Sequence, residues 1–169
     1  VEPASCPTMT KSPFSYDHGD VAKMTPLLPM HSLGHTFVPP PIHAGGLRYH
    51  GMSAQVSALK QAGIIEAKNT TQKAIFDASL SFTRAEGIIP APETTHALAC
   101  VIDEAKKARE EGKEKVILFN WSGHGLIDLA AYDRYLSGQL EDYAFPSEDI
   151  EEAEKVLKAY PKPQTIKNV

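Results

Sequence analysis

The run FNWSGHG, residues 119–125, joins an apolar segment to the start of a predicted helix. In open α/β sheets, ligands bind beyond the carboxyl ends of the strands. Gly123 and Gly125 let the backbone approach a ligand closely, and Ser122 stands where its hydroxyl would touch that ligand. The same residues are also explained by an ordinary glycine-containing strand-to-helix turn in which Ser122 caps the helix. An esterase nucleophile elbow is disfavoured, because Asn120 takes the place of the first glycine in G-x-S-x-G.

A second candidate is the run EGIIPAPETTH, residues 86–96. Pro90 and Pro92 bracket a turn that brings Glu93 to the start of a helix. A carboxylate at this position is stabilised by the helix dipole, which is a purely structural explanation. The functional alternative is a carboxylate that faces a ligand. We expect His96 to be a packed or solvent-facing helix residue rather than a base.

The histidines are concentrated in the first part of the chain, and two of them have the spacing of metal ligands. His31 and His35 stand at i and i+4, which would suit a metal ion bound on a helix. Pro29 and Gly34 argue against a helix there. The acidic stretch at residues 141–154 has an ordinary amphipathic pattern and indicates a solvated helix face. We therefore predict no metal site.

The elements that would position these residues begin after residue 52. Apolar spacing predicts helices over residues 53–62, 72–86, 94–110, 127–136 and 148–160. Residues 64–68 are a predicted strand, and the continuous apolar run 116–119 is typical of a parallel strand covered on both faces. Two strands are fewer than the usual five or so. We predict an α/β fold with an incomplete parallel sheet flanked by helices, unless further strands lie in the proline-rich opening.

The first 52 residues are predicted to be mostly loop, since eight of the thirteen prolines precede residue 42. Such a long irregular stretch is rare in a compact domain unless it wraps a site or another domain. We therefore interpret residues 1–52 as a proline- and histidine-rich region that lines a site. Residues 53–140 would form the α/β core, and residues 141–169 a terminal helix and tail.

Composition restricts the class of protein further. The chain has 169 residues, 42% of them hydrophobic, which suits an ordinary globular core. A net charge of −4 gives no bulk attraction to nucleic acid or anionic membrane. No apolar run approaches a membrane span, and Cys6 and Cys100 lie in no metal or redox spacing, so we expect a cytoplasmic protein. The chain opens on Val1 in a segment that reads like the interior of a longer protein, and we expect a fragment.

Four runs, taken in order, resemble the tryptophan synthase beta chain. They are VEP at the start, LGHTFVPPPIHAGGLRYHGM at 33–52, EGIIPAPETTHALA at 86–99 and VILFNWSGHG at 116–125. The resemblance extends from Val1 to about Tyr135. The long proline and histidine run is similar to the divergent second type of beta chain, found mostly in archaea and some bacteria. The standard type has an acidic residue where this chain has Arg48.

The resemblance implies the fold of the type II pyridoxal-phosphate enzymes, in which two α/β domains hold the cofactor between them. This chain resembles the carboxyl-terminal portion only. The lysine that binds the cofactor covalently lies in the family's amino-terminal half and has no counterpart here. The GGGSN loop that holds the cofactor phosphate is also absent from the sequence. We therefore expect this portion alone to be inactive.

The resemblance also assigns roles to individual residues. Ser122 matches the serine whose hydroxyl forms a hydrogen bond with the pyridine nitrogen, and Gly123 adjoins it at the cofactor. Glu93 matches the glutamate near the cofactor ring. Gly46 lies in the loop on the indole side. Arg48 stands on the substrate side, where its departure from the standard family affects domain closure and the preferred amino acid.

The activity that the resemblance implies is condensation of L-serine with indole to give L-tryptophan. A homodimer is expected, whereas the unusual loop argues against the standard complex with an alpha subunit. One alternative is a related β-replacing or deaminating enzyme that acts on serine, threonine or O-phosphoserine. Arg48 keeps this open, since a cation near the substrate could favour an anionic leaving group. The other alternative is a non-catalytic binding or assembly domain.

Overall fold

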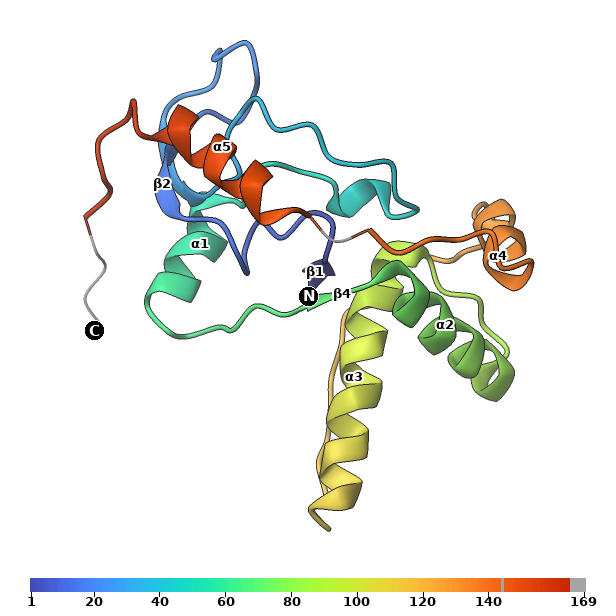
Figure 1. Cartoon of the computed structure of the whole chain (residues 1–169). Helices are drawn as coiled ribbons and strands as arrows, with labels where there is room; N and C mark the ends of the chain where they lie inside the picture. The colour runs from blue at the N-terminus through green and yellow to red at the C-terminus, as the bar shows by residue number, and fades with distance from the viewer. Residues whose placement is uncertain (144, 165–169) are drawn as a thin grey trace. The chain divides into compact units, whose positions relative to one another are not determined.

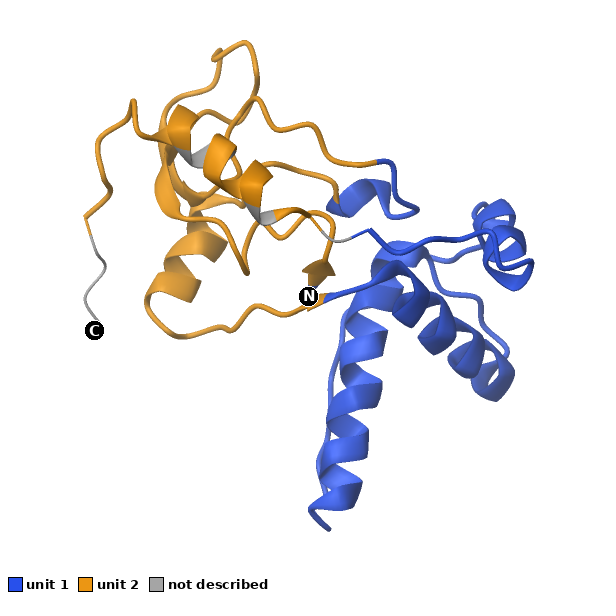
Figure 2. Ribbon diagram, viewed as in Figure 1, with its two compact units in different colours: residues 1, 41–47, 70–143 blue, residues 2–40, 48–69, 144–169 orange. Residues whose placement is uncertain are grey.

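The computed structural model describes residues 1–143 and 145–164, and the chain divides into two compact units (Figures 1 and 2). Unit 1 comprises Val1 and residues 41–47 and 70–143. Unit 2 comprises residues 2–40 and 48–69 and the described part of 144–169.

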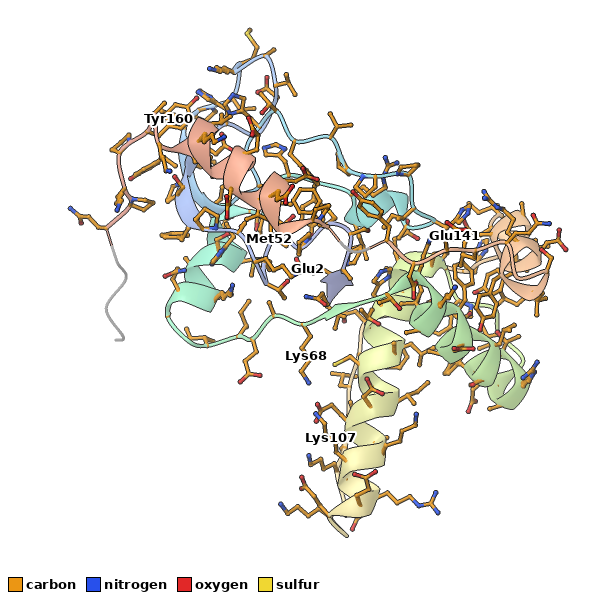
Figure 3. All side chains as sticks on the ribbon, viewed as in Figure 1. Glu2, Met52, Lys68, Lys107, Glu141 and Tyr160 are labelled. Carbon is orange, nitrogen blue, oxygen red and sulfur yellow. The ribbon has the colours of Figure 1, made fainter. Side chains whose placement is uncertain are left out.

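Unit 1 is helical. It contains a 3-10 turn η1 (Gly45–Leu47), α2 (Gln72–Glu86), α3 (Pro92–Glu110) and α4 (Leu129–Leu136). The Thr71 side chain caps α2 by accepting from the Ala74 N–H, and Gly87 ends the helix with φ 71°. Helix α2 packs against both α3 and α4. Towards its end α3 carries charged side chains such as Lys107, which is paired with Glu104 (Figure 3).

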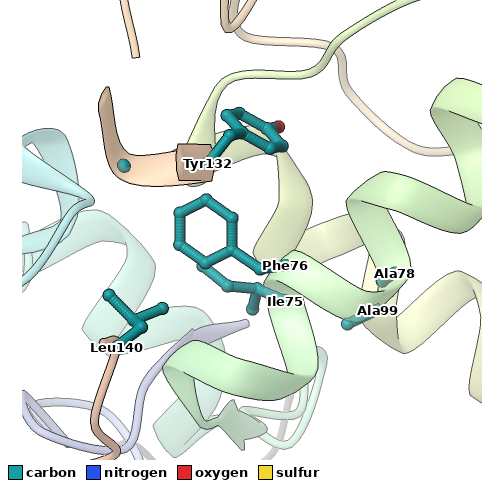
Figure 4. Packing of buried hydrophobic residues seen from close by; sticks show 7 residues of the cluster. Ile75, Phe76, Ala78, Ala99, Tyr132 and Leu140 are labelled. Carbon is teal, nitrogen blue, oxygen red and sulfur yellow. The ribbon is translucent and has the colours of Figure 1, made fainter. Parts of the chain in front are cut away.

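The core of unit 1 forms around Phe76, which is 1% exposed. The ring of Tyr132 meets Phe76 edge to face at 5.0 Å, and Tyr135 stacks on it at 5.5 Å. Such aromatic pairs add about 0.5–1.5 kcal/mol to the burial of their surface. The buried members of this cluster are Ile75, Phe76, Ala78, Ala99, Ala131, Tyr132 and Leu140 (Figure 4). The cluster fixes the helices that carry the candidate site.

Unit 2 combines short strands with two helices. Strand β2 (Phe14–Asp17) pairs antiparallel with β3 (Leu28–His31), and β1 (Glu2–Pro3) pairs with β4 (Asn69–Thr70). Helix α1 (Ala54–Gln61) packs on β3, and α5 (Ser147–Leu157) packs on β2. Unit 2 also has a small apolar core. It consists of Cys6, Leu33 and Phe145, with Phe37 and Ile150 against them.

A buried carboxylate organises the β2–β3 region of unit 2. Asp17 is 0% exposed, and its Oδ1 lies 2.6 Å from His35 Nδ1 and accepts the His18 backbone N–H at 2.8 Å. Its Oδ2 accepts the Ser32 hydroxyl at 2.5 Å and lies 3.9 Å from His50 Nε2. We call these five residues the Asp17 cluster. In the described part of the chain, no group of three or more metal-binding side chains could hold a metal ion.

The α/β class is confirmed in a coarse form, as helices with small sheets. The alternative that strands lie in the proline-rich opening is also confirmed, by β1, β2 and β3. The predicted strand at 116–119 is wrong, since these residues join no ladder and Val116 is 99% exposed. The strand predicted at 64–68 is also wrong, because β4 begins only at Asn69. An apolar run becomes a buried strand only where neighbouring strands and covering layers meet it.

All five predicted helices are present, with small shifts at their ends. Helix α2 has the predicted bounds, whereas α3 begins two residues early, at Pro92. Helix α5 ends at Leu157, three residues before the predicted end. Gly63 and Gly112, the predicted helix stops, have φ values of 70° and 63°. None of the helices among the described residues is long and apolar enough to cross a membrane.

Candidate active site

The two runs singled out in the sequence form adjoining turns in unit 1. The Ala91 backbone N–H donates to Gly123 O at 3.0 Å, and the Gly125 N–H donates to Ile89 O at 2.8 Å. Pro90 and His124 form an antiparallel bridge between these two bonds. The turn before α3 and the turn at 122–125 are therefore held together by backbone.

Gly125 is required by the closeness of this contact. A Cβ atom at residue 125 would lie 2.5 Å from the carbonyl oxygen of Pro90 and 2.9 Å from Ile89 Cγ2. The same Pro90 oxygen accepts the Tyr132 hydroxyl at 2.5 Å, and that hydroxyl also meets Ser79 Oγ. The turns are thus anchored to the aromatic core of unit 1.

Thr94 connects the first turn of α3 to Ser122. Its hydroxyl oxygen lies 2.8 Å from Ser122 Oγ and accepts the backbone N–H groups of Ser122 and Gly123, each at 3.1 Å. Thr94 is 2% exposed, whereas Ser122 is exposed. The buried Thr94 hydroxyl thus holds Ser122 from the protein interior and leaves the solvent-facing side of the serine open to a ligand.

Glu93 lies one residue before Thr94 and contacts the 41–47 loop. Its Oε1 accepts the Gly46 N–H at 3.0 Å, and a Cβ at residue 46 would lie 3.3 Å from Glu93 Cγ. The loop is held again at His43, whose N–H donates to Gln72 Oε1 at 2.9 Å. Gly46 therefore allows the loop to approach the carboxylate closely.

Further titratable groups surround this carboxylate. Burial raises the pKa of Asp128, and the negative charge of Glu93 raises it further. Burial lowers the pKa of His43, with Arg134 adding to the effect and Asp128 opposing it. The region thus contains two carboxylates that interact and a histidine whose neutral form is favoured.

His96 is a packed residue, in line with one of the two expected roles. It is 2% exposed, and its Nδ1 lies 2.8 Å from Pro92 O. A carbonyl only accepts, so Nδ1 carries the proton and donates it. Burial lowers the pKa of His96 to about 4, which keeps the ring neutral near pH 7.

Most of the residues predicted for the site lie in unit 1. The structure joins Gly46 to Glu93 and connects Gly123 and Ser122 to Thr94, the next residue in α3. Arg48 lies in unit 2, where its Nη2 donates to Pro39 O at 2.9 Å.

Sequence reasoning missed Thr94 and Asp128. The signal for Thr94 was its place beside Glu93 in the first helical turn. Asp128 had a weaker signal, as the residue that precedes α4.

No protein-family model matches the chain. Tryptophan synthase beta chain 2 of Methanosarcina mazei is 58% identical over 141 residues, which cover 83% of this chain and 32% of the relative. The protein of the same name from Aeropyrum pernix is 57% identical over 143 residues, covering 85% and 32%. The tryptophan synthase beta chain of Pyrococcus horikoshii is 54% identical over 143 residues, covering 85% and 31%.

The chain spans about a third of the length of these curated relatives. The resemblance predicted from the four sequence runs is confirmed, including the similarity to the second type of beta chain, since two of these three relatives are named beta chain 2. Over most of its length, this chain corresponds to a portion of a tryptophan synthase beta chain.

Proposed function

We propose that this chain is the carboxyl-terminal portion of a pyridoxal-phosphate enzyme that condenses L-serine with indole to give L-tryptophan and water. The observation that carries this proposal is the joined pair of turns at 89–94 and 122–125. They present the exposed Ser122 hydroxyl within a chain that is 53–58% identical to tryptophan synthase beta chains. The names of the relatives suggest the reaction, and the site residues fit one part of it.

The residues of this chain fit the ring end of the cofactor. A serine hydroxyl is both donor and acceptor, so Ser122 suits a pyridine nitrogen. Gly123 has no side chain, and a Cβ there would have only Ala91 Cβ nearby, at 3.5 Å. A flat ring can therefore approach the backbone at this turn. The groups that would bind the phosphate and the aldehyde are proposed to come from the rest of the whole protein.

Pyridoxal phosphate supplies an electron-withdrawing ring that stabilises negative charge on the α-carbon of a bound amino acid. Ser122, as a neutral partner of the ring nitrogen, keeps that withdrawal weaker than a carboxylate partner would. This weaker withdrawal suits a reaction in which the substrate L-serine loses its hydroxyl as water and indole then adds in its place.

Glu93 is the residue of this chain placed to move a proton. The Gly46 N–H holds Oε1, and no described donor forms a hydrogen bond with Oε2. Oε2 is therefore free to hold or accept a proton at the substrate.

The finer assignments belong to the same proposal. The whole protein would have the two-domain type II fold, with residues 1–52 lining the site, 53–140 forming the core and 141–169 forming a terminal helix and tail. It would act as a homodimer, and its unusual loop argues against the standard complex with an alpha subunit. Arg48 is proposed to stand on the substrate side in the whole protein. Cys6 and Cys100 are free thiols, which suits a reducing cytoplasm.

Replacement of Ser122 by Ala in the whole protein tests the proposal. The ring nitrogen would lose its partner at a cost of about 1–3 kcal/mol, so the cofactor should bind roughly 5- to 150-fold more weakly. Tryptophan formation from serine and indole should fall as well. Ser137→Ala is the matched control, since Ser137 is exposed just after α4 and its hydroxyl donates to the Arg134 carbonyl, away from the site.

Three outcomes are informative besides the expected one. Unchanged cofactor affinity and indole consumption in Ser122→Ala would contradict the proposed role. A whole protein that binds the cofactor but consumes serine, threonine or O-phosphoserine without indole would favour the related enzyme class. A whole protein without cofactor binding would favour a binding or assembly function. The chain studied alone is the negative control, and it is proposed to form no tryptophan.

A further inference from the structure

The hydroxyl of Thr94 takes part in four short contacts. It accepts from the N–H groups of Ser122 and Gly123 at 3.1 Å, and it lies 2.8 Å from Ser122 Oγ and 3.3 Å from Gly123 O. Because Thr94 is 2% exposed, water does not replace these partners readily. The direction of each hydrogen bond can therefore be worked out from the number of donors and acceptors.

A threonine hydroxyl has two acceptor lone pairs and one proton. The two backbone N–H groups occupy both lone pairs of Thr94, so its proton must go to Ser122 Oγ or to Gly123 O. Gly123 O already accepts the Ala91 N–H at 3.0 Å and is the more distant of the two, at 3.3 Å. Ser122 Oγ, at 2.8 Å, is the better acceptor. Thr94 therefore donates to Ser122.

The consequence falls on the proton of Ser122. With Thr94 as its donor, the serine hydroxyl has no vacant lone pair on Thr94 to donate to. Among the described residues, Ser122 Oγ forms no other side-chain hydrogen bond. Its proton is left for a ligand on its exposed side.

We propose that Thr94 is a positioning residue that fixes the Ser122 hydroxyl as a hydrogen-bond donor, so that the cofactor's ring nitrogen is held as an unprotonated acceptor. This inference rests on the proposed function. Thr94 touches no cofactor atom itself and acts only through Ser122. A serine without this partner would be free to rotate and accept a proton from the ring nitrogen instead.

Two substitutions separate the hydroxyl from the shape of the side chain. Thr94→Val keeps the volume and removes the hydroxyl, whereas Thr94→Ser keeps the hydroxyl and removes a methyl group. In this chain, Thr94→Val should speed amide hydrogen exchange at Ser122 and Gly123 by roughly 2- to 10-fold, the effect of one lost hydrogen bond. Thr94→Ser should leave exchange at both amides near the parent rate. Equal protection in the parent and in Thr94→Val would overturn the hydrogen-bond network.

The second measurement reads the ring nitrogen itself. The whole protein is loaded with pyridoxal phosphate carrying ¹⁵N in the ring, and the ¹⁵N chemical shift is followed as the pH is lowered. The nitrogen should stay unprotonated in the parent and in Thr94→Ser, and it should take up a proton at higher pH in Thr94→Val. If Thr94 acted only through packing, removal of its hydroxyl in Thr94→Val would not favour protonation of the ring nitrogen. Nor would Thr94→Ser, which keeps the hydroxyl but loses a methyl group, titrate like the parent.

The outcomes separate this inference from the proposed function. A parent protein that binds no pyridoxal phosphate overturns both. A parent that binds it and forms tryptophan, with the same ¹⁵N titration in Thr94→Val as in Thr94→Ser, supports the proposed function and overturns the role of Thr94. A protonated ring nitrogen in the parent also overturns the inference, because Ser122 would then be the acceptor.

Discussion

The Asp17 cluster of unit 2 and the Thr94–Ser122 pair of unit 1 are both small polar networks, but they end differently. In the Asp17 cluster both carboxylate oxygens have partners within the chain, and Asp17 is 0% exposed. In the Thr94–Ser122 pair the buried member is fully bonded, whereas the outer member is exposed and keeps one proton. One network is closed, and the other ends at the surface.

This difference separates a structural role from a functional one. A closed buried network stabilises a unique arrangement of the backbone, and losing one member leaves several groups unsatisfied. A network whose exposed hydroxyl has no acceptor for its proton within the chain contributes less to stability. Such a network can bind a ligand without breaking internal hydrogen bonds. In the sequence, the spacing of His31 and His35 raised the question of a metal site. In the structure, the buried His35 instead contacts Asp17 and helps to hold strand β2 in place.

The largest effect is expected at the centre of the closed network. Asp17→Asn keeps the side-chain volume but replaces one carboxylate oxygen with a donor that faces other donors. The free energy of unfolding of unit 2 should fall by about 3–5 kcal/mol, the usual cost of breaking a buried, paired charge. Urea unfolding followed by circular dichroism, with amide exchange at His18, measures the loss.

Asp149→Asn is the matched control for this prediction, because Asp149 is exposed in the first turn of α5. It should change stability by a few tenths of a kcal/mol. If Asp17→Asn is as stable as this control, the cluster is not the structural centre of unit 2 and the contrast with Thr94–Ser122 fails.

The next effect concerns the backbone that holds the open network. In Gly125→Ala the new Cβ would clash with the carbonyl oxygen of Pro90, which cannot move without shifting the turn before α3. We expect a loss near the upper end of the 1–3 kcal/mol that overpacking typically costs.

Gly123→Ala is a close control for that prediction. Its Cβ would meet only Ala91 Cβ, at an ordinary 3.5 Å, so the fold should tolerate it within about 1 kcal/mol. The two variants are compared by urea unfolding of this chain. Equal destabilisation would show that the contact at Pro90 does not anchor the site.

The helices of this chain could be predicted from its sequence because their signals are local. Periodic apolar residues, Ser53 and Thr71 as caps and Gly87 as a stop all act within a few residues. Strands depend on partners that lie elsewhere. The run at 116–119 has the composition of a buried strand, but among the described residues it meets no ladder.

The candidate site was predictable where a residue type carries chemistry directly. Ser122 stood out as a hydroxyl in a glycine-containing turn and Glu93 as a carboxylate at the start of a helix, and the family resemblance gave them roles. Thr94 was not predicted, because its part depends on three distances to another turn. The strands in the proline-rich opening could be raised only as an alternative for a related reason, since Pro29 lies within β3 and proline normally argues against a strand.

The smallest predicted effect is a dependence of stability on pH. The ring of His35 in the closed network meets the Asp17 carboxylate, whereas Nδ1 of His96 in unit 1 donates to the neutral Pro92 carbonyl. Burial lowers the pKa of His96 from 6.5 to about 4 in the folded chain. Above pH 6.5 the ring is neutral in both states, so it imposes no penalty. As the pH falls below 6.5, the unfolded chain takes up a proton that the folded chain refuses until about pH 4.

Unit 1 should therefore lose about 2 kcal/mol of stability from His96 alone between about pH 7 and pH 5. The fluorescence of Trp121, the only tryptophan in the chain, reports unfolding of this unit in urea. His96→Gln should flatten the dependence while leaving a smaller slope, because burial also lowers the pKa of His43 in the same unit. If the parent and His96→Gln lose stability equally over this range, His96 is not held neutral by burial, and the contrast between the two histidines is wrong.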